Sequence, residues 1–273
     1  MRVTFVGLGA IGWPMAMHLA HRHELTVYNR TTARATDFAR RYSVRIADTP
    51  RQAAEGADVV VTCLPTSREV EALLDGSDGL LAGLRRGAML LDCTSGDPAG
   101  SRRIAQRLAE KDIAFADAPV SGGTNGAEAG TLTIMVGADA STFQRARPVL
   151  EGFGQRIQHM GPVGTGHAMK AVNNALLAVN ILAVGEGLAA LVKAGVPART
   201  AVEVLNASER TFLRERIAGP GTGSDRRLAP HVQTGPVGQG RGYSSRSIEG
   251  HRRSGSHDRH FGAAAGPGPG WAR

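Results

Sequence analysis

Cysteine is scarce in this sequence, which contains only Cys63 and Cys93. Two cysteines are too few for a disulfide framework, and each lies near the end of an apolar run. We therefore expect small buried thiols in a reducing compartment, and not a secreted disulfide scaffold.

Leader-like and membrane-spanning segments are also missing from the pattern. A strand-like run follows Met1-Arg2 directly, so we expect no signal-peptide core. The longest apolar stretch, residues 176–192, is interrupted by two glycines, an asparagine and a glutamate. This favours a buried helix over a membrane span. We expect a cytoplasmic protein without a membrane partner.

Acidic residues are too few to balance the basic ones, and the net charge is +8. Residues 219–273 hold eight Arg and no Lys against three acidic residues, which gives this segment +5 and leaves +3 for the other 218 residues. The basic residues therefore form no patterned face on the folded part. The segment also lacks interleaved aromatics, so we expect no nucleic-acid partner.

The chain has 273 residues, 42% of them hydrophobic, which suffices for one large domain or two smaller ones. Through residue 160, short apolar runs alternate with amphipathic segments. Near-continuous apolar runs are typical of parallel strands covered on both faces. We predict an α/β fold with a doubly wound Rossmann sheet. Strands are expected at residues 3–6, 25–28, 58–63, 89–93, 114–118 and 132–136, and helices at 12–21, 32–41, 98–111 and 141–152.

The pattern changes after Gly166. Residues 167–194 are rich in Ala, Leu and Val and free of Pro, which predicts the long central helix of an all-α domain. Gly195-Val196-Pro197 ends it and opens a second helix over residues 198–206. The last 55 residues contain 13 Gly and five Pro without a periodic apolar pattern, so we expect disorder. The predicted domains are 1–162 (NAD(P)-binding, Rossmann), 163–218 (partial, truncated all-α) and 219–273 (disordered tail).

A Gly-rich turn, Gly7-Leu8-Gly9-Ala10-Ile11-Gly12, follows the first strand and opens the first helix. The first Gly permits the tight turn, the second lets the backbone approach a pyrophosphate, and the third allows close helix–strand packing. The helix N-terminus then faces the phosphate charge. All six residues are candidate ligands of a dinucleotide, and the alternative is a merely tight turn.

No carboxylate stands at the end of the second strand, where NAD-specific sites usually place one on the ribose hydroxyls. The sequence there is Asn29-Arg30-Thr31, and Arg30 could pair with a 2′-phosphate. We expect these three residues at the cofactor, and NADP in preference to NAD. The alternative is a solvated Arg30 that stacks on adenine.

Two later segments carry polar groups that suit a substrate. The backbone amides of Ser121-Gly122-Gly123, with the serine hydroxyl, could receive a carboxylate; a loop with glycines for its turns is the alternative. Lys170, Asn173 and Asn174 share one helical face. A lysine desolvated in a cleft has a lowered pKa and can exchange a proton with an alcohol, whereas the alternative is a solvated charge. No metal site is expected.

Six segments follow one another in a fixed order: Gly7–Ala16 (Gly-Leu-Gly-x-x-Gly-x-Pro-Met-Ala), Leu64-Pro65, Asp92–Ser95, Asp117–Gly123, Gly130–Gly137 and Gly164–Asn174. Together they resemble the β-hydroxyacid dehydrogenase family, which includes 3-hydroxyisobutyrate dehydrogenase, tartronate semialdehyde reductase and succinic-semialdehyde/glyoxylate reductases. The resemblance covers about residues 2–210.

This resemblance implies an NAD(P)-dependent oxidoreductase that transfers a hydride between nicotinamide and a small β-hydroxyacid or semialdehyde. It implies that Lys170 is the catalytic acid and base. Asn174 and the Ser121-Gly122-Gly123 loop are then expected to hold the substrate carboxylate, while Leu64-Pro65 and Ser95 line the cofactor. Imine reductases share this architecture but replace the lysine, so Lys170 favours a hydroxyacid or semialdehyde substrate.

The last quarter departs from the family's pattern. Family members continue with helices that complete the substrate cleft and the dimer, including a Lys-Asp motif whose lysine approaches the cofactor. This chain has no Lys after Lys193, and its Arg/Gly/Pro-rich end is typical of an out-of-frame reading of a GC-rich gene. We hypothesise a frameshift near residues 205–225. It would leave the long helix without partners and compromise a family-type homo-oligomer, so the alternative function is a dinucleotide-binding remnant without turnover.

Overall fold

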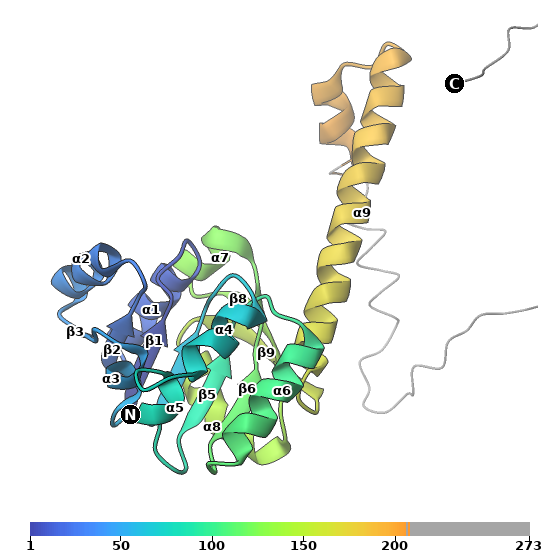
Figure 1. The fold of residues 1–273 in the computed structure, drawn as a ribbon. Coiled ribbons are helices and arrows are strands. Elements are labelled where there is room, and N and C mark those ends of the chain that lie inside the picture. Colours follow the sequence, from blue (N-terminus) through green and yellow to red (C-terminus); the bar gives the residue numbers. More distant parts are fainter. Residues whose placement is uncertain (206, 208–273) are drawn as a thin grey trace, which may run out of the picture. The chain divides into compact units, whose positions relative to one another are not determined.

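The computed structural model describes residues 1–205 and 207, and the expected tail lies outside them. Within the described residues the strands form one nine-stranded sheet (Figure 1). Its order is β3-β2-β1-β4-β5-β6-β8-β7, with β9 beside β8. The strands are β1 (Arg2–Val6), β2 (Glu24–Tyr28), β3 (Arg45–Ile46), β4 (Val59–Thr62), β5 (Met89–Asp92), β6 (Ala114–Asp117), β7 (Val120–Ser121), β8 (Leu132–Gly137) and β9 (Gly154–Gly161).

Strands β1 to β6 are parallel, whereas β8 runs antiparallel to β6 and β7 and parallel to β9. The order β3-β2-β1-β4-β5-β6 is that of doubly wound folds. The predicted α/β class, with a Rossmann sheet followed by a helical region, is therefore confirmed. The boundaries proposed for the domains stay predictions.

Helices cover both faces of this sheet. Side chains of α1, α2 and α8 enter one apolar core with alternate strand residues, and those of α3 to α6 enter a second core. Val59 and Val61 belong to the first core and Val60 to the second, which explains the continuous apolar run of β4. The helices are α1 (Gly12–Ala20), α2 (Thr32–Tyr42), α3 (Pro50–Ala54), α4 (Ser67–Leu74), α5 (Leu80–Gly83), α6 (Pro98–Ala109), α7 (Gly123–Glu128), α8 (Ala140–Leu150) and α9 (Thr165–Lys193).

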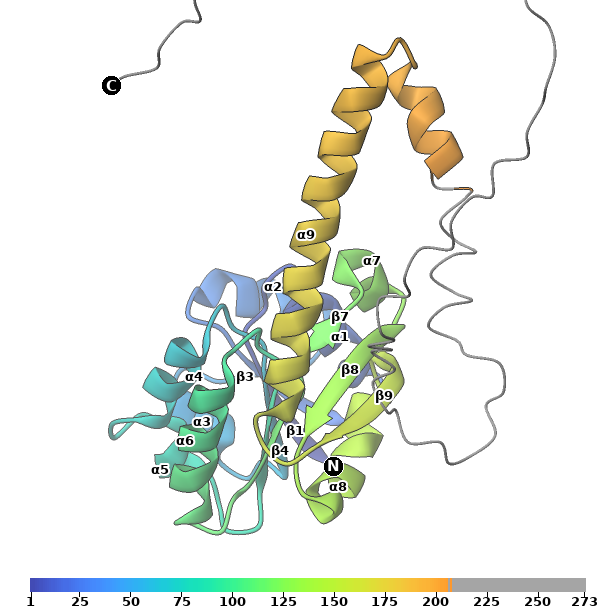
Figure 2. The same ribbon diagram turned by 90° about the vertical axis from the view of Figure 1, so that its right-hand side faces the viewer.

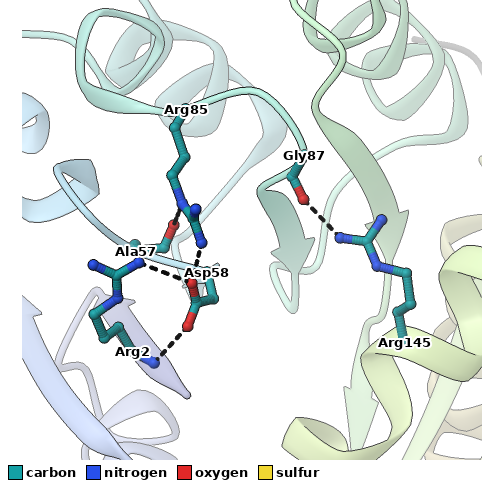
Figure 3. A network of polar contacts seen from close by, with 6 residues as sticks. All are labelled: Arg2, Ala57, Asp58, Arg85, Gly87 and Arg145. Atoms are coloured by element: carbon teal, nitrogen blue, oxygen red, sulfur yellow. Dashed lines mark hydrogen bonds and ion pairs between the residues drawn. The ribbon is translucent and has the colours of Figure 1, made fainter.

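Arginine side chains join elements at the amino-terminal end of the sheet (Figure 3). Arg2 donates to the Asp58 carboxylate through its backbone N–H (2.9 Å) and through Nη2 (3.1 Å). Arg85 also contacts this carboxylate. Just before β5, Nη2 of Arg145 in α8 donates to the carbonyl of Gly87 (2.7 Å). These contacts leave the opposite, carboxyl-terminal end of the strands for the site.

Helix α9 is the long helix expected from the sequence, and residues 198–205 form the expected second helix after Pro197. Both views show α9 running away from the sheet (Figures 1 and 2). The expectation that its apolar stretch is buried is wrong for the described residues. Leu182 is 68% exposed and Ile181 63%. The helix is apolar on all sides. Its pattern therefore predicts a helix but does not indicate which side packs against another element.

By length and composition α9 could also cross a membrane. The core helix of a soluble protein passes the same test, so this property is weak evidence. The start of α9 is held against the sheet, with Gly166 and His167 buried.

Candidate active site

Three glycines shape the turn from β1 into α1, each in a different way. Gly7 has a φ of +101°, and a Cβ atom there would lie 2.3 Å from the carbonyl oxygen of Cys63. A Cβ atom at Gly12 would lie 2.0 Å from the carbonyl oxygen of Gly7. Among the described residues, nothing beyond its chain neighbours comes within 4 Å of the same position at Gly9. The fold therefore needs the first and third glycines, while the second leaves space beside the helix N-terminus.

A cleft of about 450 Å³ opens beside this turn, at the carboxyl ends of β1, β2 and β4. The strand order reverses between β1 and β4, which is where doubly wound folds bind ligands. The N-cap residue of α1, Ile11, gives no side-chain hydrogen bond to the first turn, so no side chain covers the positive end of this helix, which can face an anion. Seven predicted cofactor residues line the cleft: Gly7, Gly9, Asn29, Arg30, Thr31, Leu64 and Pro65.

The other predicted cofactor residues do not line this cleft. Leu8 and Ala10 border a second, more open hollow beside α2. Ile11 and Gly12 lie at the start of α1, and Ser95 follows β5 by three residues. The cleft therefore gathers the predicted residues at the carboxyl ends of β1, β2 and β4 and leaves out Ser95 after β5.

Asn29 supports the Gly-rich turn directly. Its Oδ1 accepts the N–H of Leu8 (2.9 Å), and its Nδ2 donates to the carbonyl of Thr31 (2.9 Å). Arg34 in α2 donates from Nη1 to the carbonyl of Leu8 (3.1 Å). Both side chains thus fix the backbone at the mouth of the cleft, a role that the sequence did not suggest for Arg34.

Arg30 differs from these neighbours because its side chain is exposed and does not bond to the backbone of the turn. It is exposed and has no hydrogen-bond or ion-pair partner among the residues that the structure describes. The acid that lines the cleft, Glu69, belongs to α4 and not to the end of β2. A hydrogen bond from the Thr66 hydroxyl chiefly lowers the pKa of Glu69, and the charge of Arg30 adds to this. The cleft thus contains, after β2, a cation that makes no hydrogen bond within the described residues and whose charge acts on Glu69.

Cys63 also lines the cleft, and it is half-buried where the sequence predicted a buried thiol. The reason is its position one residue after β4, where the edge of the sheet opens. Cys93 is buried as expected. Both thiols are free, and burial raises the pKa of Cys63 to about 12. The cysteines are therefore protonated at neutral pH and supply no thiolate.

The Ser121-Gly122-Gly123 loop joins β7 to α7 beside strand β8. Ser121 pairs with Thr133 of β8. Gly122 and Gly123 have φ values of +138° and +63°, and a Cβ atom at Gly123 would have nothing within 4 Å among the described residues. The loop therefore depends on glycine for its conformation and leaves open backbone, as an anion-binding loop requires.

Lys170 lies in the second turn of α9, which packs against β8 and β6. It is half-buried, and burial lowers the pKa of its ammonium group. It has no hydrogen-bond or ion-pair partner within the described part of the chain. Asn173 is half-buried, and Asn174 is exposed and accepts a bond from Asn173 (3.4 Å). The lysine is thus partly desolvated and unpaired, with two amides one turn away.

Family models match most of the described chain. Residues 2–161 match the NAD binding domain of 6-phosphogluconate dehydrogenase. Residues 164–216 match the NAD-binding domain of NADP-dependent 3-hydroxyisobutyrate dehydrogenase.

Individual relatives agree with these models. The chain is 41% identical over 207 residues to an NAD-dependent L-serine dehydrogenase of Pseudomonas aeruginosa, covering 76% of this chain and 70% of that protein. It is 40% identical over 207 residues to a 3-hydroxyisobutyrate dehydrogenase of the same organism, covering 76% and 69%. Among solved structures, the Mycobacterium tuberculosis 3-hydroxyisobutyrate dehydrogenase with L-serine has a TM-score of 0.69 and 34% identity, covering 76% and 70%.

Proposed function

The chain belongs to the β-hydroxyacid dehydrogenase family, and we propose that it oxidises a small β-hydroxyacid, or reduces the corresponding semialdehyde, with Lys170 as general acid and base. The observation that carries this proposal is the state of Lys170. A half-buried, unpaired amine whose pKa is lowered by burial loses its proton more readily than a solvated lysine does, so it is suited to exchange a proton with an alcohol.

The cleft fits a nicotinamide dinucleotide, which when bound accepts or supplies the hydride. The open space at Gly9, beside the N-terminus of α1, accommodates a pyrophosphate, and the positive end of the helix dipole favours its charge there. The Leu64-Pro65 segment continues the cleft away from the adenosine end. In oxidation Lys170 takes the hydroxyl proton, and in reduction it returns that proton to the new hydroxyl.

The proposed substrate is a small carboxylate. The open amides of the Ser121-Gly122-Gly123 loop, together with Asn174, hold its carboxyl group by hydrogen bonds. Both segments lie beside β8, since β7 pairs with this strand and α9 packs on it. Fixing the carboxylate orients the reacting carbon, which converts binding energy into rate.

We propose NADP as the preferred cofactor, because Arg30 is free to pair with a 2′-phosphate. An Arg30→Ser change should weaken NADPH binding by about 10-fold to 100-fold, the value of a charged hydrogen-bonded pair, and leave NADH binding unchanged. Arg40→Ser is the matched control, since Arg40 is an exposed arginine of α2, the helix that follows Arg30, and it pairs with Asp37. Fluorescence titration measures both affinities, and tighter binding of NADH than NADPH to the unaltered chain would contradict the preference.

The activity itself is tested by NADP⁺ and NAD⁺ reduction with a panel of small β-hydroxyacids. Lys170→Ala should lower kcat by about 10²-fold to 10⁴-fold, the range for a lost general acid or base. Lys193→Ala removes an exposed lysine from the last turn of the same helix and should have no effect. Equal rates for the two variants would refute the role of Lys170.

A second candidate is a dinucleotide-binding remnant without turnover. It is favoured by the exposed apolar side chains of α9, which an active family member would need to cover. NADPH binding without turnover on the whole panel would support it. A helical, Lys-Asp-containing continuation in another reading frame of the gene would explain how such a remnant arose.

We further propose a cytoplasmic location and association between copies of the chain. The two free thiols suit a reducing compartment. The exposed apolar residues of α9 favour self-association, although the hypothetical frameshift would weaken a family-type oligomer. Sedimentation over a range of concentrations tests the second point, and a monomer at all concentrations would contradict it.

A further inference from the structure

The first turn of α9 is held by a carboxylate that lies far away in the sequence. Asp117, the last residue of β6, is fully buried. Its Oδ1 accepts the N–H of Gly164 (2.7 Å), and its Oδ2 accepts the N–H of His167 (2.8 Å). The N-cap residue Gly164 has no side chain, so Asp117 acts as the cap of α9.

The side chain of His167 makes a second set of bonds from the same turn. It is fully buried, and its Nε2 lies 2.8 Å from the carbonyl oxygen of Thr94. A carbonyl can only accept, so Nε2 carries the hydrogen. Nδ1 lies 2.6 Å from the Ser101 hydroxyl, which also lies 3.1 Å from the carbonyl oxygen of Asp97. The ring therefore joins α9 to α6 and to the segment after β5.

Thr94 extends this connection to the cofactor cleft. Its Oγ1 accepts the N–H of Leu64 (3.1 Å), and Leu64 lines the cleft. Its own N–H donates to the buried carboxylate of Asp92 (3.1 Å). A continuous set of buried and partly buried bonds thus runs from the start of α9 to the wall of the nucleotide site.

Glycines allow these elements to approach closely. A Cβ atom at Gly166 would lie 2.3 Å from the carbonyl oxygen of Met135 and 2.8 Å from that of Asp117. A Cβ atom at Gly137 would lie 2.5 Å from Oδ1 of Asp117. The packing around the carboxylate therefore has no room for a side chain at either position.

Within the described part of α9, Gly166 and His167 are the buried residues of a 29-residue helix. The first turn must therefore set the direction of the helix. Lys170 follows His167 by three residues, and residues at that spacing are neighbours on one helical face. A shift of the first turn of α9 would therefore also displace the Lys170 amine.

We propose that Asp117 and His167 are positioning residues, which hold the Lys170 amine at a fixed place relative to the Leu64 wall of the cofactor cleft. The inference rests on the proposed function in naming Lys170 as the acid and base. Burial raises the pKa of Asp117 and the two N–H donors oppose that rise, as expected for a carboxylate whose role is to bind the helix end.

The kinetic test compares His167→Ala and Asp117→Asn with a matched control. Asp139→Asn alters the cap of α8, where Asp139 accepts the N–H of Thr142 (2.9 Å) away from the site. We expect the two site variants to lower kcat by about 100-fold, the cost of a misplacement near 1 Å, with NADPH affinity kept within about twofold. His167→Gln retains an N–H donor for Thr94 and should recover part of the loss. An equal loss in Asp139→Asn would reduce the effect to general destabilisation and overturn the proposal.

A second readout does not need activity. The chain has three lysines, Lys111, Lys170 and Lys193, so reductive methylation with ¹³C-formaldehyde gives few NMR signals. The Lys170 signal should titrate below the ordinary lysine range in the unaltered chain and move upward in His167→Ala, because the released amine becomes solvated. Ser101→Ala, which removes one bond only, serves if His167→Ala does not fold.

These readouts separate the two proposals. If the unaltered chain turns over no substrate, the proposed function fails, but the titration still tests whether Asp117 and His167 position Lys170. If the pKa of Lys170 is the same in the unaltered chain, in His167→Ala and in Ser101→Ala, the positioning role of His167 is refuted, whatever the turnover shows.

Discussion

Strands β4 and β5 and helix α9 are built from the same apolar residue types, yet they differ in what covers them. Every residue of β4 and β5 is buried between two layers of helices. In α9 the buried residues of the described chain are Gly166 and His167, at its polar first turn. An apolar segment is therefore buried only where the fold supplies a second surface that covers it. Helix α9 is held at its base by hydrogen bonds.

The largest expected difference comes from matched leucines in the two regions. Leu91 in β5 is fully buried, whereas Leu182 in α9 is 68% exposed. Leu91→Ala should lower the free energy of unfolding by about 2–5 kcal/mol, and Leu182→Ala by less than about 0.5 kcal/mol. Denaturant titration measures both. A comparable loss in Leu182→Ala would mean that α9 is covered in solution.

The glycines of the nucleotide turn provide the next comparison. Gly7→Ala should cost about 2–4 kcal/mol of folding stability, because it places a side chain at positive φ and against the Cys63 carbonyl. Gly9→Ala should leave stability unchanged and weaken NADPH binding at least about tenfold, because it fills the proposed pyrophosphate space. Thermal melts and NADPH titrations distinguish the two variants. Normal NADPH binding by Gly9→Ala would contradict the proposed position of the pyrophosphate beside Gly9.

The smallest expected effect is on the pH dependence of folding stability, and it arises from Asp58 beside the sheet and not from α9. The backbone N–H of Arg2 and the guanidinium groups of Arg2 and Arg85 lower the pKa of Asp58 to about 2. A lowered pKa in the folded state stabilises the protein above the unfolded value near 3.9, and this contribution disappears as the pH falls towards 2. With solvent screening it amounts to about 1 kcal/mol. Asp58→Asn should therefore lose less stability than the unaltered chain between pH 5 and pH 2.5, and identical losses would contradict this.

The strands and helices that carry the nucleotide site could be predicted because their signals are local. The apolar runs of β1, β4 and β5 and the Gly-rich turn each need only a few neighbouring residues. The short strands β3 and β7 and the polar strand β9 were missed, since they contain little apolar pattern. Helix α4 was also missed, although Thr66 followed by Glu69 is a helix-start signal.

The candidate site could be predicted only in part. The Gly-rich turn and Arg30 were found at the cleft, since their spacing to the strands is fixed. The hydrogen bonds that hold the first turn of α9 could not be predicted from the sequence. Asp117 and His167 are 50 residues apart in the chain, and Ser101 and His167 are 66 residues apart. The exposure of α9 could be expected only through the frameshift hypothesis, since a helix that is apolar on all sides gives no information about its own partners.

The cleft at β1, β2 and β4 is lined without any residue of α9. The most direct measurement is a fluorescence titration of NADPH against the unaltered chain and Lys170→Ala. We expect saturable binding with the same Kd for both proteins. Absence of binding, or binding that is lost with Lys170, would contradict it.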